Sequence, residues 1–139
     1  MENITWSDSY ETGHPIVDGQ HRNLFVLINN LNENIKTNVS KNVLIDIMDK
    51  LSNYVEIHFK TEEDLMTFTN YPDYKSHKQE HENLRVQAQK LIELFKLEKV
   101  DLTATIAQFL SDWLQHHIND IDVKMITWVK SNEVIDKTC

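Results

Sequence analysis

The residues that interrupt or cross-link a chain are scarce here: 139 residues include two glycines, two prolines and one cysteine. Folds with many strands need frequent turns, so this scarcity predicts a few long helices. The single cysteine, Cys139, leaves no partner for a disulfide within the sequence, which fits a reducing compartment. The first residues also lack the basic and apolar regions of a signal peptide. The cytoplasm is therefore the expected location.

Positive charge and long apolar runs are scarce as well. Fourteen Lys and Arg against 22 Asp and Glu give a net charge of −8, which disfavours nucleic acid and anionic membrane surfaces as partners. No apolar run approaches the roughly 20 residues of a membrane-spanning helix. Residues 1–139 are expected to form a single domain and a monomer.

The N-terminal region differs in pattern from the rest of the chain. Residues 1–17 predict an extended arm, which Trp6, Ile16 and Val17 are expected to pack onto the body of the protein. Asp18 is then the expected N-cap of a first helix that reaches about residue 37. Its apolar residues recur with helical spacing, so one face of this helix is expected to be buried.

Three further stretches have the same helical spacing of apolar residues. One covers about residues 40–68, the next starts between residues 73 and 76, and the last starts at Asp101 or Thr103. Four helices with short connections predict an all-α protein, an antiparallel up-down-up-down four-helix bundle over about residues 18–120. A weaker pattern beyond it predicts a short C-terminal helix and tail at 121–139.

Histidines and carboxylates recur on the apolar face of every expected helix. Residues four apart lie about 40° apart around a helix, so the pairs His58/Glu62 and His77/His81 each point two donor groups in one direction. Burying such groups is costly unless a partner satisfies them. A pair of metal ions would satisfy seven at once: His21, His58, Glu62, His77, His81, His117 and Asp122.

The positions of these groups along the helices are mutually consistent. A lone histidine on an apolar face is more often an ordinary core residue than a ligand. Here, however, the groups fall near the start of the first and third helices and near the end of the second and fourth, which is one end of such a bundle. Seven ligands exceed a tetrahedral zinc site, and imidazoles with carboxylates but no thiolate suit two iron or manganese ions.

The fourth helix leaves two ligand pairs open. His116 and Asp120 are four residues apart and share a face, whereas His117 and Asp122 are five apart, about 140° around an ideal α-helix. The apolar stripe nevertheless favours His117. If His117 and Asp122 are the ligands, the helix must loosen or bulge between Ile118 and Asp122.

The combined motif resembles the hemerythrin family, particularly its bacterial single-domain branch. The resemblance covers nearly the whole chain. It is carried by Trp6, Asp18-x-x-His21, His58-Phe59-Lys60-Thr61-Glu62-Glu63, Met66, Tyr71-Pro72, His77-x3-His81 and His117-Ile118-x3-Asp122. The family pattern selects His117 and Asp122 as the ligands in the fourth helix.

The resemblance implies a non-haem centre of two iron ions, Fe2+ or Fe3+, with an oxo or hydroxo bridge. Glu62 and Asp122 would bridge the irons. One iron would be held by three histidines and the other by two, which leaves one position on the second for dioxygen. The implied histidine sets are His77, His81 and His117 for the first iron, and His21 and His58 for the second.

The function implied by the resemblance is reversible dioxygen binding for storage, delivery or sensing, without enzymatic turnover and with a protein partner for delivery or signalling. Four apolar residues match the family's oxygen pocket and offer no acid or base: Leu24, Phe59, Trp113 and Ile118. Two alternatives stay open. One is a di-iron oxidoreductase acting on peroxide or nitric oxide, and the other is an iron buffer or sensor.

Overall fold

A computed structural model describes residues 2–101 and 104–132, so Thr103 and Cys139 lie outside the described residues. All regular elements within these ranges are helical. In chain order they are the 3-10 helix η1 (Asp8–Tyr10), α1 (Pro15–Lys36), α2 (Lys41–Thr69), α3 (Tyr74–Lys96), α4 (Ala104–His116), the π-helix η2 (His117–Asp122) and α5 (Val123–Asn132).

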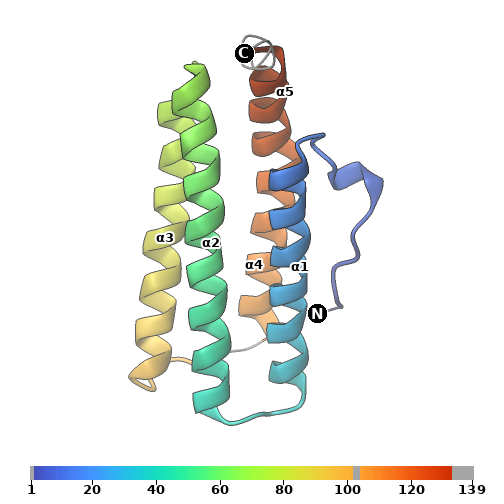
Figure 1. Cartoon of the computed structure of the whole chain (residues 1–139). Coiled ribbons are helices and arrows are strands. Elements are labelled where there is room, and N and C mark those ends of the chain that lie inside the picture. The colour runs from blue at the N-terminus through green and yellow to red at the C-terminus, as the bar shows by residue number, and fades with distance from the viewer. Residues whose placement is uncertain (1, 102–103, 133–139) are drawn as a thin grey trace.

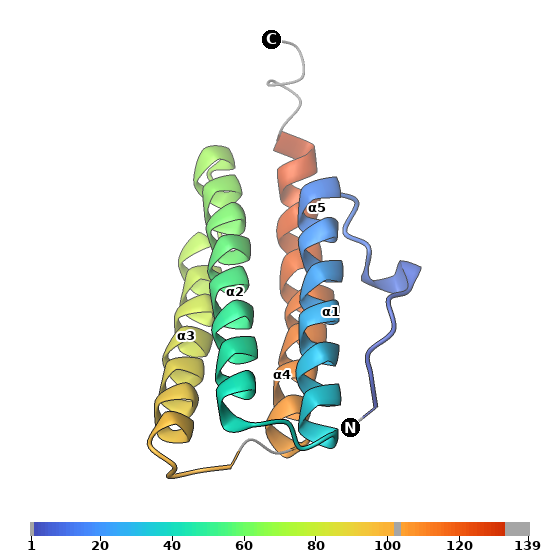
Figure 2. The same cartoon turned by 60° about the horizontal axis from the view of Figure 1, so that its bottom comes forward.

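The long helices form a bundle in which successive helices run in opposite directions (Figure 1). In both views α3 lies beside α2, and α4 lies beside α1 (Figures 1 and 2). The predicted antiparallel four-helix bundle is therefore confirmed. The start of α1, the end of α2 and the start of α3 lie toward the same end of the bundle as α5 (Figure 1).

The helix ends follow local sequence signals. The Ser40 side chain accepts a hydrogen bond from the Val43 amide and caps α2. Asn70 ends α2 in the left-handed conformation, with φ of 57°, which asparagine adopts more readily than most residues. The third helix begins at Tyr74, inside the predicted range.

The predicted start of the first helix is wrong. The helix α1 begins at Pro15, and the N-cap is His14, whose side chain accepts a hydrogen bond from the Val17 amide. Proline suits the first helical position because its φ is already helical and it has no amide hydrogen to satisfy there. Asp18 instead lies in the first turn, where its buried carboxylate accepts hydrogen bonds from the backbone and hydroxyl of Thr12 and the amide of Gly13.

The N-terminal arm packs against α1, but of the three residues predicted to hold it there, one is exposed. Trp6 lies edge-on to Phe25, with ring centroids 5.2 Å apart, and Val17 is fully buried. Ile16, by contrast, is 61% exposed. The helix starts before Ile16, so this residue points away from the body while its neighbour Val17 points inward.

The fourth helix is irregular where the sequence predicts it to be. The helices α4, η2 and α5 succeed one another without a gap, so the short C-terminal helix continues the fourth helix (Figure 1). In η2 the backbone is π-helical, and the Val123 amide donates to the Ile118 carbonyl five residues earlier. The π-helix confirms the predicted irregularity between Ile118 and Asp122.

Two apolar clusters fill the interior. The larger joins α1, α2, α3 and the fourth helix and includes Leu24, Phe25 and Leu114. The smaller lies toward the end of the bundle where α2 ends and α1 and α3 begin, and its core residues, such as Met66 and Met125, are fully or almost fully buried. None of the described helices is both long and apolar enough to cross a membrane.

Candidate metal centre

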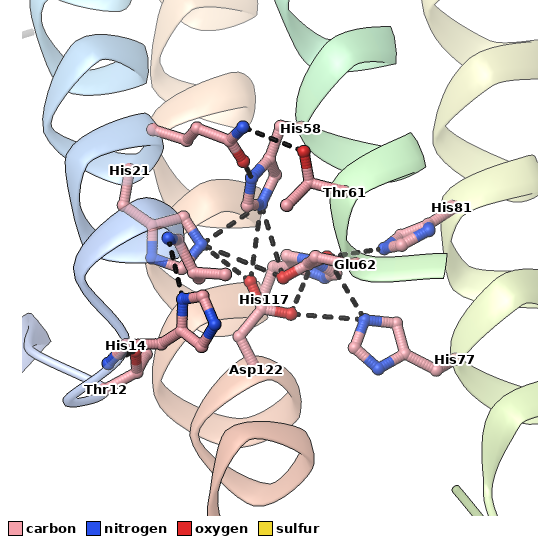
Figure 3. A network of polar contacts seen from close by, with 12 residues as sticks. Thr12, His14, His21, His58, Thr61, Glu62, His77, His81, His117 and Asp122 are labelled. Atoms are coloured by element: carbon pink, nitrogen blue, oxygen red, sulfur yellow. Dashed lines mark hydrogen bonds and ion pairs between the residues drawn. The ribbon is translucent and has the colours of Figure 1, made fainter. Parts of the chain in front are cut away.

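The bundle brings the predicted histidines and carboxylates together inside one end. Figure 3 shows the side chains from four helices pointing toward one another. None of the seven is more than 3% exposed. These seven residues, called the site residues below, are His21, His58, Glu62, His77, His81, His117 and Asp122.

The site residues form two overlapping groups with the geometry of cation sites. In each group, one nitrogen or oxygen per residue lies within 4.8 Å of the others. The first group consists of Glu62 and three histidines; the second contains both carboxylates and two histidines. The three-histidine group is Glu62, His77, His81 and His117, and the two-histidine group is His21, His58, Glu62 and Asp122.

The two oxygens of Glu62 face different groups. Its Oε1 lies 2.9 Å from His81 Nε2 and 3.1 Å from His117 Nε2. Its Oε2 lies 3.3 Å from His58 Nε2 and 3.9 Å from His21 Nε2. One carboxylate therefore presents one oxygen to each group of histidines.

The two oxygens of Asp122 also face different groups of histidines. Its Oδ1 lies 2.9 Å from His117 Nε2 and 3.1 Å from His77 Nε2. Its Oδ2 lies 2.7 Å from His21 Nε2 and 3.5 Å from His58 Nε2. Because the backbone between His117 and Asp122 is π-helical, two residues five apart point into the same space.

The donor set fits metal ions better than hydrogen bonding alone. Among the described residues, Glu62 Oε2, His77 Nε2 and Asp122 Oδ1 are buried and have no hydrogen-bond partner, an arrangement that is costly unless something compensates it. Several of the nitrogen–oxygen separations are also near 3 Å. Neighbouring ligands on an octahedral ion with bonds of about 2.1 Å lie about 3 Å apart.

The carboxylates control the charge of the site. Burial alone would lower the pKa of His58, but Glu62 and Asp122 outweigh it and raise this pKa to about 9. Burial is likewise outweighed at His117, where Asp122 and Glu62 raise the pKa to about 10. Although burial opposes it, His58 holds the pKa of Glu62 well below its ordinary value. Protons on histidines thus balance the carboxylates, and a bound cation would replace those protons.

The alternative pair in the fourth helix lies on the surface. His116 and Asp120 are 59% and 63% exposed at their side chains and form an ion pair of 2.7 Å with each other. His117 is buried and stacks on Trp113, with centroids 4.6 Å apart and an interplanar angle of 13°. The register that places His117 and Asp122 inside is therefore the one that the structure adopts.

Two polar side chains contact the histidines from behind. The Gln20 side-chain oxygen lies 2.8 Å from His58 Nδ1, and the Gln20 amide group donates to the Thr61 hydroxyl. On the other side, Glu63 Oε2 lies 2.9 Å from His81 Nδ1. The sequence contains one signal for the second contact, since Glu63 directly succeeds Glu62; for Gln20 it contains none.

Apolar residues cover one side of the site. Leu24, Phe59 and Trp113 line a cavity of about 80 Å³ that continues into the larger apolar cluster. Ile118 is fully buried in that cluster but does not line the cavity. Arg85 and Glu56 also reach this cavity, where they form an ion pair of 2.8 Å.

A four-helix bundle with five imidazoles and two carboxylates in its interior defines the class: an all-helical protein with a buried cation-binding centre. Residues 12–129 match the family model described as "Hemerythrin HHE cation binding domain". This match spans most of the sequence. The chain belongs to the hemerythrin family.

Known proteins of this family resemble the chain along most of its length. The bacteriohemerythrin of Methylococcus capsulatus is 30% identical over 123 residues, which cover 88% of this chain and 93% of that protein. A hemerythrin-like protein of Naegleria gruberi is 34% identical and covers 87% and 89%. The crystal structure of a wild-type hemerythrin superposes with a TM-score of 0.87 at 28% identity, covering 92% of this chain and 98% of that chain.

Proposed function

We propose that this protein binds dioxygen reversibly at two iron ions held by the seven site residues. The observation that carries the proposal is the orientation of Glu62 and Asp122. Each carboxylate has one oxygen toward the three-histidine group and one toward the two-histidine group. Such an arrangement supports a pair of ions that share Glu62 and Asp122. Imidazole and carboxylate donors without thiolate suit iron.

The bound irons, with an oxo or hydroxo bridge, would supply the electrons that reversible dioxygen binding requires. The chain's own residues hold the two ions and limit access to them. His77, His81 and His117 would hold one ion, and His21 and His58 the other, which leaves the second with fewer protein donors. Dioxygen is then expected on the two-histidine side.

Exclusion of water supports binding over turnover. Phe59 stacks on His81 and Trp113 stacks on His117, while Leu24 and Ile118 are buried in the larger apolar cluster. The acid and base that reach the apolar cavity, Glu56 and Arg85, neutralise each other. An oxidoreductase would need a proton donor beside the bound oxygen, and the predicted pocket residues Leu24, Phe59, Trp113 and Ile118 offer none. We therefore assign storage, delivery or sensing of dioxygen rather than catalysis.

Repeated oxygenation tests this function. The iron-loaded protein is reduced without air, exposed to dioxygen, and then returned to an oxygen-free atmosphere while its visible absorption is monitored. We expect a new absorption band that disappears and returns over several cycles, with one dioxygen bound per two irons. Continuous oxygen consumption would contradict the proposal and favour an oxidase. Loss of iron in each cycle would favour an iron buffer or sensor.

A further inference from the structure

The two groups of histidines differ in what supports them from behind. His58 in the two-histidine group has a neutral partner, the Gln20 amide. His81 in the three-histidine group has a charged one, the Glu63 carboxylate. The Nδ1 atoms of the remaining three histidines, His21, His77 and His117, have no hydrogen-bond partner among the described residues. His81 is therefore the site histidine whose outer nitrogen faces a carboxylate.

Glu63 is itself fixed by a cluster on the outer side of α2 and α3. Its Oε2 accepts a hydrogen bond of 3.2 Å from Arg85 in addition to the contact with His81. Arg85 is held in turn by Glu56, with Nε–oxygen distances of 2.8 and 3.0 Å, and by Glu82 at 3.2 Å. Only 18% of the Arg85 side chain and 16% of the Glu63 side chain is exposed, so solvent screens this pair incompletely.

The same cluster also supports the face of the His81 ring. Phe59 stacks on His81 with centroids 3.8 Å apart and an interplanar angle of 9°. The Arg85 guanidinium carbon lies 5.2 Å from the Phe59 ring centroid, within the range of a cation–π contact. Arg85 thus contacts both groups that hold the ring: Glu63 at its edge and Phe59 on its face.

We propose that Glu63, held by Arg85, is a positioning residue that fixes His81 and makes it a stronger metal donor than the other four site histidines. The proposal rests on the proposed function only for the identity of the metal. When His81 donates its Nδ1 hydrogen to a carboxylate, Nε2 keeps its lone pair toward Glu62 and the three-histidine group. The negative charge behind the ring also increases electron donation from Nε2.

The consequence is an electronic difference between the two ions. The ion in the three-histidine group would have a charged partner behind one of its ligands, whereas the ion in the two-histidine group would have only the Gln20 amide. Loss of the Glu63 carboxylate should selectively lower the metal affinity of the three-histidine group. It should also make a ferric ion there less stable, which raises the reduction potential.

Glu63→Gln is the direct test, because it keeps the length of the side chain and an oxygen acceptor but removes the charge. Titration of the metal-free protein with Co2+, monitored by visible absorption, should show affinity for one of two ions lowered by about 10- to 100-fold, the usual effect of removing such a partner. In the iron-loaded variant, the midpoint potential measured by spectroelectrochemistry should shift to more positive values.

Asp64→Asn is the matched control. It also removes one carboxylate and lies next to Glu63 in sequence, but its contact is with Lys60, outside the Arg85 cluster, and its side chain is 66% exposed. We expect unchanged Co2+ affinity and potential. Glu63→Asp keeps the charge with a shorter reach, so it should restore part of the affinity and remains informative if Glu63→Gln fails to fold.

The outcomes separate this proposal from the function. If Glu63→Gln matches the wild type in Co2+ affinity and potential, or if Asp64→Asn changes both equally, the role of Glu63 is refuted while dioxygen binding stands. If the wild type binds Co2+ in two steps but never binds dioxygen reversibly, the function fails while the comparison of variants still decides the role of Glu63. A wild type that binds no metal overturns both.

Discussion

Two neighbouring histidines should respond in opposite ways to removal. His117→Ala is expected to lower the metal content from two ions per chain to one, because His117 belongs to the three-histidine group and not to the other. His116→Ala is expected to keep both ions. The pair is well matched, since the two positions are adjacent in sequence while one side chain is 59% exposed and the other 1%.

The expected effects on stability depend on burial. His116 contributes a single exposed ion pair with Asp120, and such pairs are worth about 0.2–1 kcal/mol. Removal of His117 leaves the buried Glu62 and Asp122 with one partner fewer, a change that typically costs about 3–5 kcal/mol. It also removes the ring that stacks on Trp113.

The assay combines metal analysis with urea unfolding. Both variants are loaded with Fe2+ without air, desalted and analysed for iron per chain, and the metal-free forms are unfolded at pH 7. A His117→Ala variant that keeps two ions, or a His116→Ala variant that loses one, would refute the assignment. Equal free energies of unfolding for the two variants would refute the role of burial.

Three further outcomes are expected. The site carboxylates raise the pKa of His117 to about 10 against the opposing effect of burial, so this group is protonated at pH 7. Metal binding should therefore release protons, and metal affinity should increase as the pH rises toward 10. Calorimetry in buffers of different ionisation enthalpy would detect the released protons. Combining Ile121→Asp with Asp122→Ala should not restore two-metal binding, because the π-helix aligns positions five apart; normal iron content would contradict this. Leu24→Asn should shorten the lifetime of the oxygenated form by admitting water, whereas Val26→Asn, at a position 61% exposed, should not; equal decay rates would argue against the apolar pocket.

The helices and the irregular turn were predictable because each has a local signal. Apolar residues at helical spacing are enough to place helices, and Ser40 and Asn70 are residue types that begin and end them. The π-helix was predictable once the family resemblance had selected His117 and Asp122 as the ligand pair. His117 and Asp122 point to the same face only if the helix is wider than an α-helix between them.

The start of α1 was not predictable with the same certainty because aspartate suits two positions. It is favoured as an N-cap and also in the first turn, where it faces the positive end of the helix. Asp18 occupies the second position because the chain turns at Gly13, with φ of 91°, and brings two backbone amides onto its carboxylate. That turn forms only when the arm folds back onto α1, so the local sequence does not reveal it.

The contacts behind the histidines lie beyond what spacing can tell. Helical periodicity shows which face of a helix carries His58 or His81, but not which way each ring turns. The partners Gln20 and Glu63 come from neighbouring positions on other helices, and their identity depends on how those helices pack. The role of the site residues as iron ligands likewise stays a prediction.

Anomalous diffraction at the iron edge, from crystals of the iron-loaded protein, tests the central claim most directly. We expect two peaks per chain, one within bonding distance of His77, His81 and His117 and the other beside His21 and His58, with Glu62 and Asp122 touching both. A single peak, or two peaks that do not share the carboxylates, would contradict the account.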